Sequence, residues 1–176
     1  MNVKKLFTDD SAVSPVIGVV LMVAITVLLA ATAATFFLSI GQENSNTTPQ
    51  VATNFDYSQD TKTLGGTAVR DDTLRISHNS GDSIVAKNVD IVVSGAQVYD
   101  SSSSSYSALN DRHQWDEFGT VSADEKVSGG DAVTLEAGTA PISSFSGLKL
   151  DSGTTVKLVW DDPSSSSTFT LNTWES

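Results

Sequence analysis

The sequence predicts an α+β protein, in which a long N-terminal hydrophobic α-helix is followed by an antiparallel β-sandwich-like head. Two observations lead to this prediction. First, the stretch from Val13 to Ile40 contains no charged side chain. Second, short segments after it alternate between apolar and polar residues, and Gly, Ser and Asp clusters separate them, as is typical of half-buried antiparallel strands. The 176 residues suffice for one ordinary domain and one additional element.

The hydrophobic segment is long enough to cross a membrane. A helix from Pro15 to Ile40 would be roughly 39 Å long at about 1.5 Å per residue, whereas a hydrocarbon core is about 30 Å thick. Ser14 is a suitable N-cap, and Pro15 suits the first helical position. In lipid, only a helix satisfies every backbone group of a single segment. We therefore expect a transmembrane or filament-core helix over residues 13–40.

Residues 1–12 form a short polar leader before this helix. Lys4 and Lys5 give it a basic region that is expected to remain on the cytoplasmic side of the membrane. An ordinary secretory signal is cut after its apolar stretch. Here the leader allows a different cut, between Ala12 and Val13, which would remove the leader and leave the helix on the mature protein.

Two other interpretations of the N-terminus stay open. Ala31-Thr32-Ala33 is a small-x-small site at which an ordinary signal peptidase could cut, although the apolar stretch exceeds the roughly 7–15 residues of a typical signal core. The segment could also be an uncleaved membrane anchor.

The charge of the chain is concentrated in its C-terminal part. Nineteen of the 21 acidic residues lie at Glu43 or later, with eight of the ten basic residues, so this part carries the whole formal net charge of −11. Such a surface repels phosphates, so no nucleic acid partner is expected. Acid-rich, lysine-poor surfaces suit high salt, which screens their self-repulsion. Without cysteine, no disulfide is possible.

Residues 41–50 are predicted to be a polar linker, and residues 51–176 the acidic head. The linker contains an N-glycosylation sequon at Asn46-Thr47-Thr48, which makes Asn46 a candidate glycosylation site. Six or seven strands are expected in the head, which suggests a β-sandwich. The last two should form a hairpin across residues 161–167, and residues 100–120 are expected to be an exposed loop. The strands are recognised from alternating pairs and triplets: Leu74 and Ile76; Val89, Ile91 and Val93; Val133 and Leu135; Val156, Leu158 and Trp160; Phe169 and Leu171.

No constellation of catalytic or metal-binding residues is found in the sequence. His78 and His113 lack metal-ligand spacing and are expected to be surface or strand residues. The paired acids do not match a calcium loop and are expected in solvated turns. We therefore predict no enzyme activity, no cofactor and no metal. The acid pairs are Asp71-Asp72, Asp116-Glu117, Asp124-Glu125 and Asp161-Asp162.

The segment from Ala12 to Val27, which reads AVSPVIGVVLMVAITV, resembles the N-terminal segment of archaeal type IV pilins, haloarchaeal ones in particular. The similarity is nearly continuous to Phe37. The head resembles haloarchaeal pilin heads more loosely, in residues 74–82, 156–160 and 174–175. The glutamate that bacterial pilins carry near their mature N-terminus is absent. The family usually has a charged residue two places before the new N-terminus, where this chain has Ser11.

The resemblance implies a precursor that a prepilin peptidase cuts between Ala12 and Val13. It also implies assembly by a cytoplasmic ATPase and a polytopic membrane platform, from the cytoplasmic membrane into a cell-surface pilus. Surface adhesion and biofilm formation are the implied roles. A swimming-filament subunit (an archaellin) and a single-pass anchored binding domain are the alternatives. The Ser14-Pro15 start favours a pilin over an archaellin.

A physical argument for polymerisation stands beside the resemblance. Helices in lipid associate through close packing, which small residues permit. We predict that Gly18, Ala24, Ala30 and Ala34 are packing positions in a filament. A helix that is apolar on all sides must be surrounded on all sides, first by lipid and then by copies of itself. Contacts of this head-to-tail kind that do not close produce helical fibres.

Overall fold

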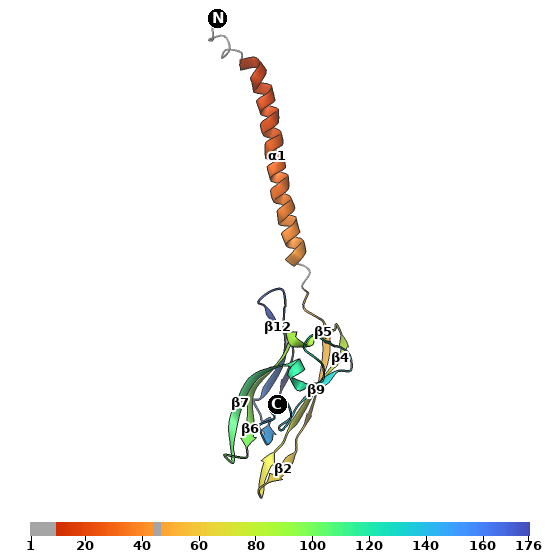
Figure 1. Cartoon of the computed structure of the whole chain (residues 1–176), viewed down its shortest axis with the longest axis vertical. Coiled ribbons are helices and arrows are strands. Elements are labelled where there is room, and N and C mark those ends of the chain that lie inside the picture. The colour runs from red at the N-terminus through yellow and green to blue at the C-terminus, as the bar shows by residue number, and fades with distance from the viewer. Residues whose placement is uncertain (1–9, 44–46) are drawn as a thin grey trace. The chain divides into compact units, whose positions relative to one another are not determined.

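A computed structural model of the chain describes residues 10–43 and 47–176. The chain divides into two compact units, one reaching to Thr47 and the other beginning at Thr48. The first contains a single long helix, and the second is the β-rich head (Figure 1). The predicted fold class, a long hydrophobic helix followed by an antiparallel β-rich head, is confirmed.

Helix α1 (Asp10–Glu43) is longer at both ends than the sequence predicted. It begins before Ser14, so Ser14 is not its N-cap, and Pro15 lies within the helix instead of at its first position. Proline holds φ near −65°, which a helix accepts, and its main cost close to a helix start is one missing backbone hydrogen bond. The boundaries predicted from Pro15 were therefore too narrow.

Within α1, the segment Val16–Ser39 is 24 residues long and is long and apolar enough to cross a membrane. Its three threonine hydroxyl groups are satisfied within the helix. Thr26 Oγ1 donates to the carbonyl of Val23, and Thr32 Oγ1 donates to that of Leu29, both at 2.9 Å. Thr35 Oγ1 donates to the carbonyl of Thr32, also at 2.9 Å. These threonines therefore bring no unpaired donor into an apolar environment.

The head is built from two main antiparallel sheets and two small two-stranded sheets (Figure 1). The first sheet has the order β1–β4–β9. In the second, the long strand β6 pairs with β7 along one edge and with β11 and β10 along the other, and β12 pairs with β11. The small sheets are the β2–β3 hairpin and the β5–β8 pair, whose strands are distant in sequence. The strands are β1 (Val51–Ser58), β2 (Thr61–Leu64), β3 (Thr67–Arg70), β4 (Thr73–Gly81), β5 (Ile84–Val85), β6 (Val89–Asp100), β7 (Ser105–Gln114), β8 (Lys126–Val127), β9 (Ala132–Leu135), β10 (Gly147–Lys149), β11 (Thr155–Asp161) and β12 (Thr168–Glu175).

Both main sheets contribute to one hydrophobic core. In the first sheet, Ile76 faces Val133 across the β4–β9 pair, and both side chains are buried. In the second, Leu158 of β11 faces Ile91 of β6, and both are again buried. Because side chains alternate between the two faces of a strand, the period-2 pattern in the sequence places these residues on inner faces. A sandwich-like head is the result.

The predicted hairpin at the end of the chain is confirmed, since Asp161 pairs with Thr168 at the start of the β11–β12 ladder. Strand β12 also approaches the first sheet. Asn172 Nδ2 donates to Thr53 Oγ1 of β1 at 2.7 Å, which connects the edges of the two sheets.

The prediction of an exposed loop over residues 100–120 was wrong. Most of this region is strand β7, which pairs with β6, and the 3₁₀ helix η3 (Trp115–Phe118). Trp115 is only 1% exposed and belongs to the core. Strand β7 is mostly polar because it lies at the sheet edge, so few of its residues need to be apolar. The head has twelve strands among its described residues, instead of six or seven, because several are too short to show a period.

A buried ion pair attaches the β2–β3 hairpin to the rest of the head. The carboxylate of Asp72 is 0% exposed and accepts two hydrogen bonds from the Arg70 guanidinium, at 2.9 and 2.6 Å. It also accepts the backbone N–H of Leu150 at 2.8 Å and the hydroxyl of Tyr57 at 3.2 Å. The hydrogen bond to Asp72 raises the pKa of Arg70. One carboxylate thus joins β1, β3 and the end of β10.

Replacing Asp72 by alanine should lower the free energy of unfolding of the head by about 3 kcal/mol, because a buried charge and a backbone donor lose their partner. Urea denaturation of the full chain in detergent, followed by tryptophan fluorescence, measures this change. Asp151→Ala is the matched control, since Asp151 contacts the same guanidinium at 3.5 Å but is half exposed. It should cost less than about 1 kcal/mol. Equal effects of the two substitutions would contradict the central role of Asp72.

Candidate functional site

The apolar surface of α1 is the most unusual feature of the described chain. Its large side chains are exposed all along the helix, from 51% for Ile17 to 71% for Phe37, and none of the segment Val16–Ser39 is buried. A soluble monomer does not leave a surface of this size in contact with water. Each exposed Val, Leu, Ile or Phe side chain would gain roughly 1.5–3 kcal/mol on leaving water. This helix requires an apolar environment.

The predicted packing residues are distributed around the helix. At about 100° per residue, Ala30 and Ala34 are separated by roughly 40° and share a face, whereas Gly18 and Ala24 lie on other sides. Gly18 is fully accessible, since a Cβ added there would meet no atom within 4 Å outside its own helical neighbourhood. Small residues on different sides permit close approach by more than one neighbouring helix.

The predicted cleavage bond, between Ala12 and Val13, lies in the first turn of α1. The ends of helices fray, so this turn opens at a lower cost than the middle of α1. The candidate glycosylation site Asn46 lies outside the described residues. Thr47, the residue that follows it, is in coil.

Two of the acid pairs were wrongly predicted to be solvated. Asp72 is the buried ion-pair partner described above. Asp162 is also buried and organises the turn between β11 and β12, where it accepts hydrogen bonds from Ser164 N at 2.9 Å and Ser165 Oγ at 2.8 Å. Hydrogen bonds from Ser164 lower the pKa of the Asp162 carboxyl. A burial difference within an acid pair is not visible in the sequence, because it depends on which residue faces the core.

Both histidines lie on strands, and both are buried. His78 Nε2 of β4 is 2.9 Å from the carbonyl oxygen of Asp82, and His113 Nδ1 of β7 is 3.0 Å from the carboxylate of Glu117. They belong to different sheets. No group of three His, Asp or Glu side chains that could hold a metal occurs among the described residues. Each histidine has a local hydrogen-bond partner instead.

An ion cluster on the second sheet was missed at the sequence level. Arg112 of β7 forms ion pairs with the buried carboxylate of Asp90 on the adjacent strand β6 and with Asp161 of β11 at 2.8 Å. Burial raises the pKa of the Asp90 carboxyl, and the hydrogen bond from Arg112 opposes this effect. The sequence did contain a signal, because Asp90 lies between the apolar residues Val89 and Ile91. A carboxylate that is buried at such a position needs a charged or hydrogen-bonding partner.

The comparisons with known proteins concern the N-terminal part most directly. A family model described as "Archaeal Type IV pilin, N-terminal" matches residues 11–53, which include nearly all of α1. One similar curated protein is an uncharacterized protein of Archaeoglobus fulgidus, 38% identical over 89 residues. That match covers 51% of this chain and 56% of the relative, so about half of each protein is compared. In its N-terminal segment, the chain is similar to the archaeal type IV pilins.

Proposed function

We propose that the chain is the structural subunit of an archaeal type IV adhesion pilus. The observation that carries the proposal is the uniformly exposed apolar surface of Val16–Ser39. In this proposal, a prepilin peptidase cuts between Ala12 and Val13, and the assembly ATPase and membrane platform then transfer the subunit from the cytoplasmic membrane into the fibre. Surface adhesion and biofilm formation follow as functions of the assembled pilus, and no catalytic role is proposed.

The helix supports polymerisation because its requirement for an apolar environment can be met in two ways. Lipid surrounds the helix before assembly, and copies of the same helix surround it in the filament. The helix has no polar face that would remain in contact with water in a small closed oligomer. Since one helix meets several neighbours through different sides, the contacts are heterologous and produce an open helical fibre.

The acidic head suits the outer surface of such a fibre. Its described residues 48–176 carry 18 acidic and 8 basic side chains, a net charge of −10. Several of the basic side chains are already occupied in ion pairs within the head, such as Arg70, Arg112 and Lys87. Neighbouring heads therefore repel each other at low salt, and screening within about 10 Å at 0.1 M removes this repulsion. A saline, halophilic setting is part of the proposal.

The second candidate is an anchored monomer with a binding head. The apolar segment supports this candidate, because its length equals that of a single membrane-spanning helix. The two candidates differ in whether copies of the helix contact each other, and the following experiments separate them.

Gly18→Leu or Ala24→Leu should abolish filaments while leaving precursor levels unchanged. Gly18 has free space around it and Ala24 is exposed, so the monomer accepts a larger side chain at either position, but that side chain keeps a neighbouring helix at a distance. Electron microscopy of negatively stained cells and immunoblots of membrane fractions report the two quantities.

Val19→Leu serves as the matched control, since it introduces the same side chain where an exposed apolar residue is already present. It should leave filaments intact. Normal pili in both small-residue variants would contradict packing through this helix and would favour the anchored monomer.

Intact-mass spectrometry of filaments sheared from cells should show a subunit that begins at Val13. The helix must remain on the mature protein if it forms the filament core, so removal of only residues 1–12 is expected. The same spectrum reports whether Asn46 carries a glycan, which we propose it does. A mature protein that begins after Ala33 would overturn both the cleavage site and the role of the helix.

A further inference from the structure

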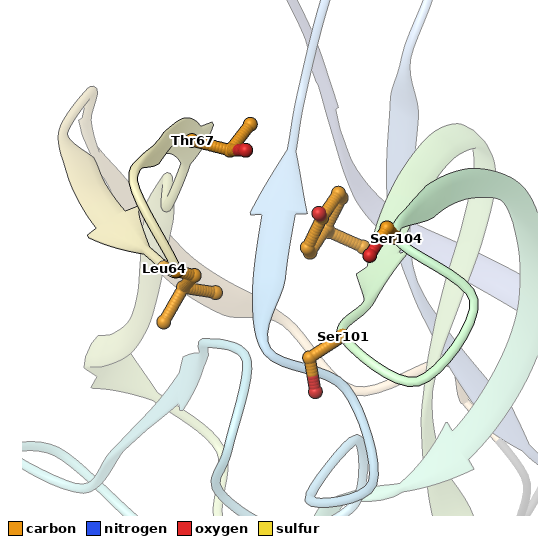
Figure 2. A pocket seen from close by; sticks show the side chains of 6 residues that line it. Leu64, Thr67, Ser101 and Ser104 are labelled. Atoms are coloured by element: carbon orange, nitrogen blue, oxygen red, sulfur yellow. The ribbon is translucent and has the colours of Figure 1, made fainter.

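A small cavity in the head has the features of a ligand site. Its volume is about 370 Å³, at the lower end of the roughly 300–1,000 Å³ of small-molecule sites. Leu64, Gly65 and Thr67 of the β2–β3 hairpin line one side, and Tyr99, Ser101 and Ser104 of the β6–β7 turn line the other. Figure 2 shows Leu64 and Thr67 on one side of the cavity and Ser101 and Ser104 on the other.

The two walls of the cavity are firmly held. Strand β10 lies between them, since it pairs with β6 at Tyr99 and approaches β3 closely at Gly147. A Cβ on Gly147 would come within 2.6 Å of the Arg70 carbonyl oxygen. The buried Arg70–Asp72 pair anchors the wall formed by the β2–β3 hairpin. In the opposite wall, Ser146 Oγ donates a hydrogen bond to Ser101 Oγ at 3.1 Å. The cavity is therefore preformed.

Tyr99 is the largest side chain that lines the cavity. Its side chain is only 6% exposed, and its ring packs edge-on against Tyr106 with a centroid separation of 5.1 Å. Within the part of the chain that the structure describes, its hydroxyl makes no hydrogen bond, and the oxygen is not one of the buried atoms left without a partner. The hydroxyl is therefore accessible from solvent and available to a molecule in the cavity.

A second feature is the backbone of Ser104. Its φ is 51°, which makes it the one residue other than glycine with a positive φ among residues 10–43 and 47–176. Ser104 ends the four-residue turn that joins Asp100 of β6 to Ser105 of β7, and such a conformation is common in short hairpin turns. Here the conformation belongs to the wall that presents Ser104 to the cavity.

The chemistry of the lining excludes charged ligands. No cationic side chain lines the cavity, and the head has a net charge of −10, so an anion would be repelled. No carboxylate lines it either, so a metal cation would lack its usual ligands. What remains is a neutral site with four hydroxyl groups, each a donor and an acceptor, beside the apolar surfaces of Leu64 and Tyr99.

We propose that this cavity binds a neutral, polyhydroxylated ligand of about one hexose unit. Sugar hydroxyls match the hydroxyl groups of Thr67, Ser101, Ser104 and Tyr99, and the C–H face of the ring matches Leu64. The ligand could be a sugar of an external surface or a glycan on another copy of this chain. Binding here does not depend on filament formation, and the first test below uses unassembled protein.

The test is saturation-transfer-difference NMR on the full chain in lauryldimethylamine oxide, a detergent that carries no sugar. D-Glucose, D-galactose, D-mannose and N-acetyl-D-glucosamine are the probes, and glucose 6-phosphate is the charged comparison. At least one neutral sugar should bind with a Kd in the low-millimolar range, and the phosphorylated sugar should bind at least tenfold more weakly. No transfer to any neutral sugar, or equal binding of the phosphorylated one, would overturn the proposal.

Tyr99→Phe and Thr67→Val each remove one hydroxyl and nearly preserve the shape of the side chain. Each should weaken sugar binding about threefold to tenfold, the usual effect of one lost hydrogen bond. Thr173→Val, on an exposed position of β12, is the matched control and should leave the Kd unchanged. Unchanged binding in both cavity variants, with folding verified by tryptophan fluorescence, would place the sugar elsewhere.

Sheared filaments distinguish the two sources of the sugar. If a glycan on another copy occupies the cavity, added hexose should bind to Asn46→Gln filaments but not to wild-type filaments. If the ligand is external, both filaments should bind it equally. Binding to neither filament, together with no binding to the detergent-solubilised chain, would exclude the site altogether.

Discussion

The apolar surface of α1 is the constraint on which the rest of the molecule depends. Over Val16–Ser39, no side chain is buried and no polar face offers water a partner. The three threonines direct their hydroxyls back to the helix carbonyls, so the segment has an apolar surface on every side. Lipid and a bundle of identical helices are the two environments that satisfy it. A subunit that moves from lipid into a bundle of identical helices needs no other side-chain property in this segment.

The head meets the opposite requirement, since it must remain soluble and rigid without disulfides. Its core is shared by two antiparallel sheets, and its buried carboxylates are ion-paired or hydrogen-bonded. Asp72 with Arg70 and Asp90 with Arg112 each place a carboxylate in the interior beside a guanidinium. These pairs connect separate strands, so they specify the arrangement of the sheets more than they add stability. Most of the other acidic side chains lie at the surface, where their charge favours solubility.

The hydroxyl-lined cavity and the assembly helix belong to different units of the chain. The proposed function requires this separation, because a surface that is buried during polymerisation cannot also bind a ligand. The walls of the cavity come from a hairpin and a strand turn, and loops and turns on a rigid scaffold are where binding residues usually lie. The buried Asp72 network supports the same wall, so the stability of the head and the shape of the cavity are connected.

The N-terminal helix could be recognised from the sequence because its signal is local: a long uncharged segment needs no tertiary information to be read as a helix. The same holds for strands such as β4 and β11, whose residues Ile76 and Leu158 alternate with polar neighbours. Strand β7 could not be recognised, because an edge strand is stabilised by pairing with β6 and needs few apolar residues. Within the acid pair Asp161-Asp162, only Asp162 is buried, and this difference depends on which residue faces the core. The cavity is the extreme case, since residues 64–67 and 99–104 become neighbours only when strand β10 packs between them.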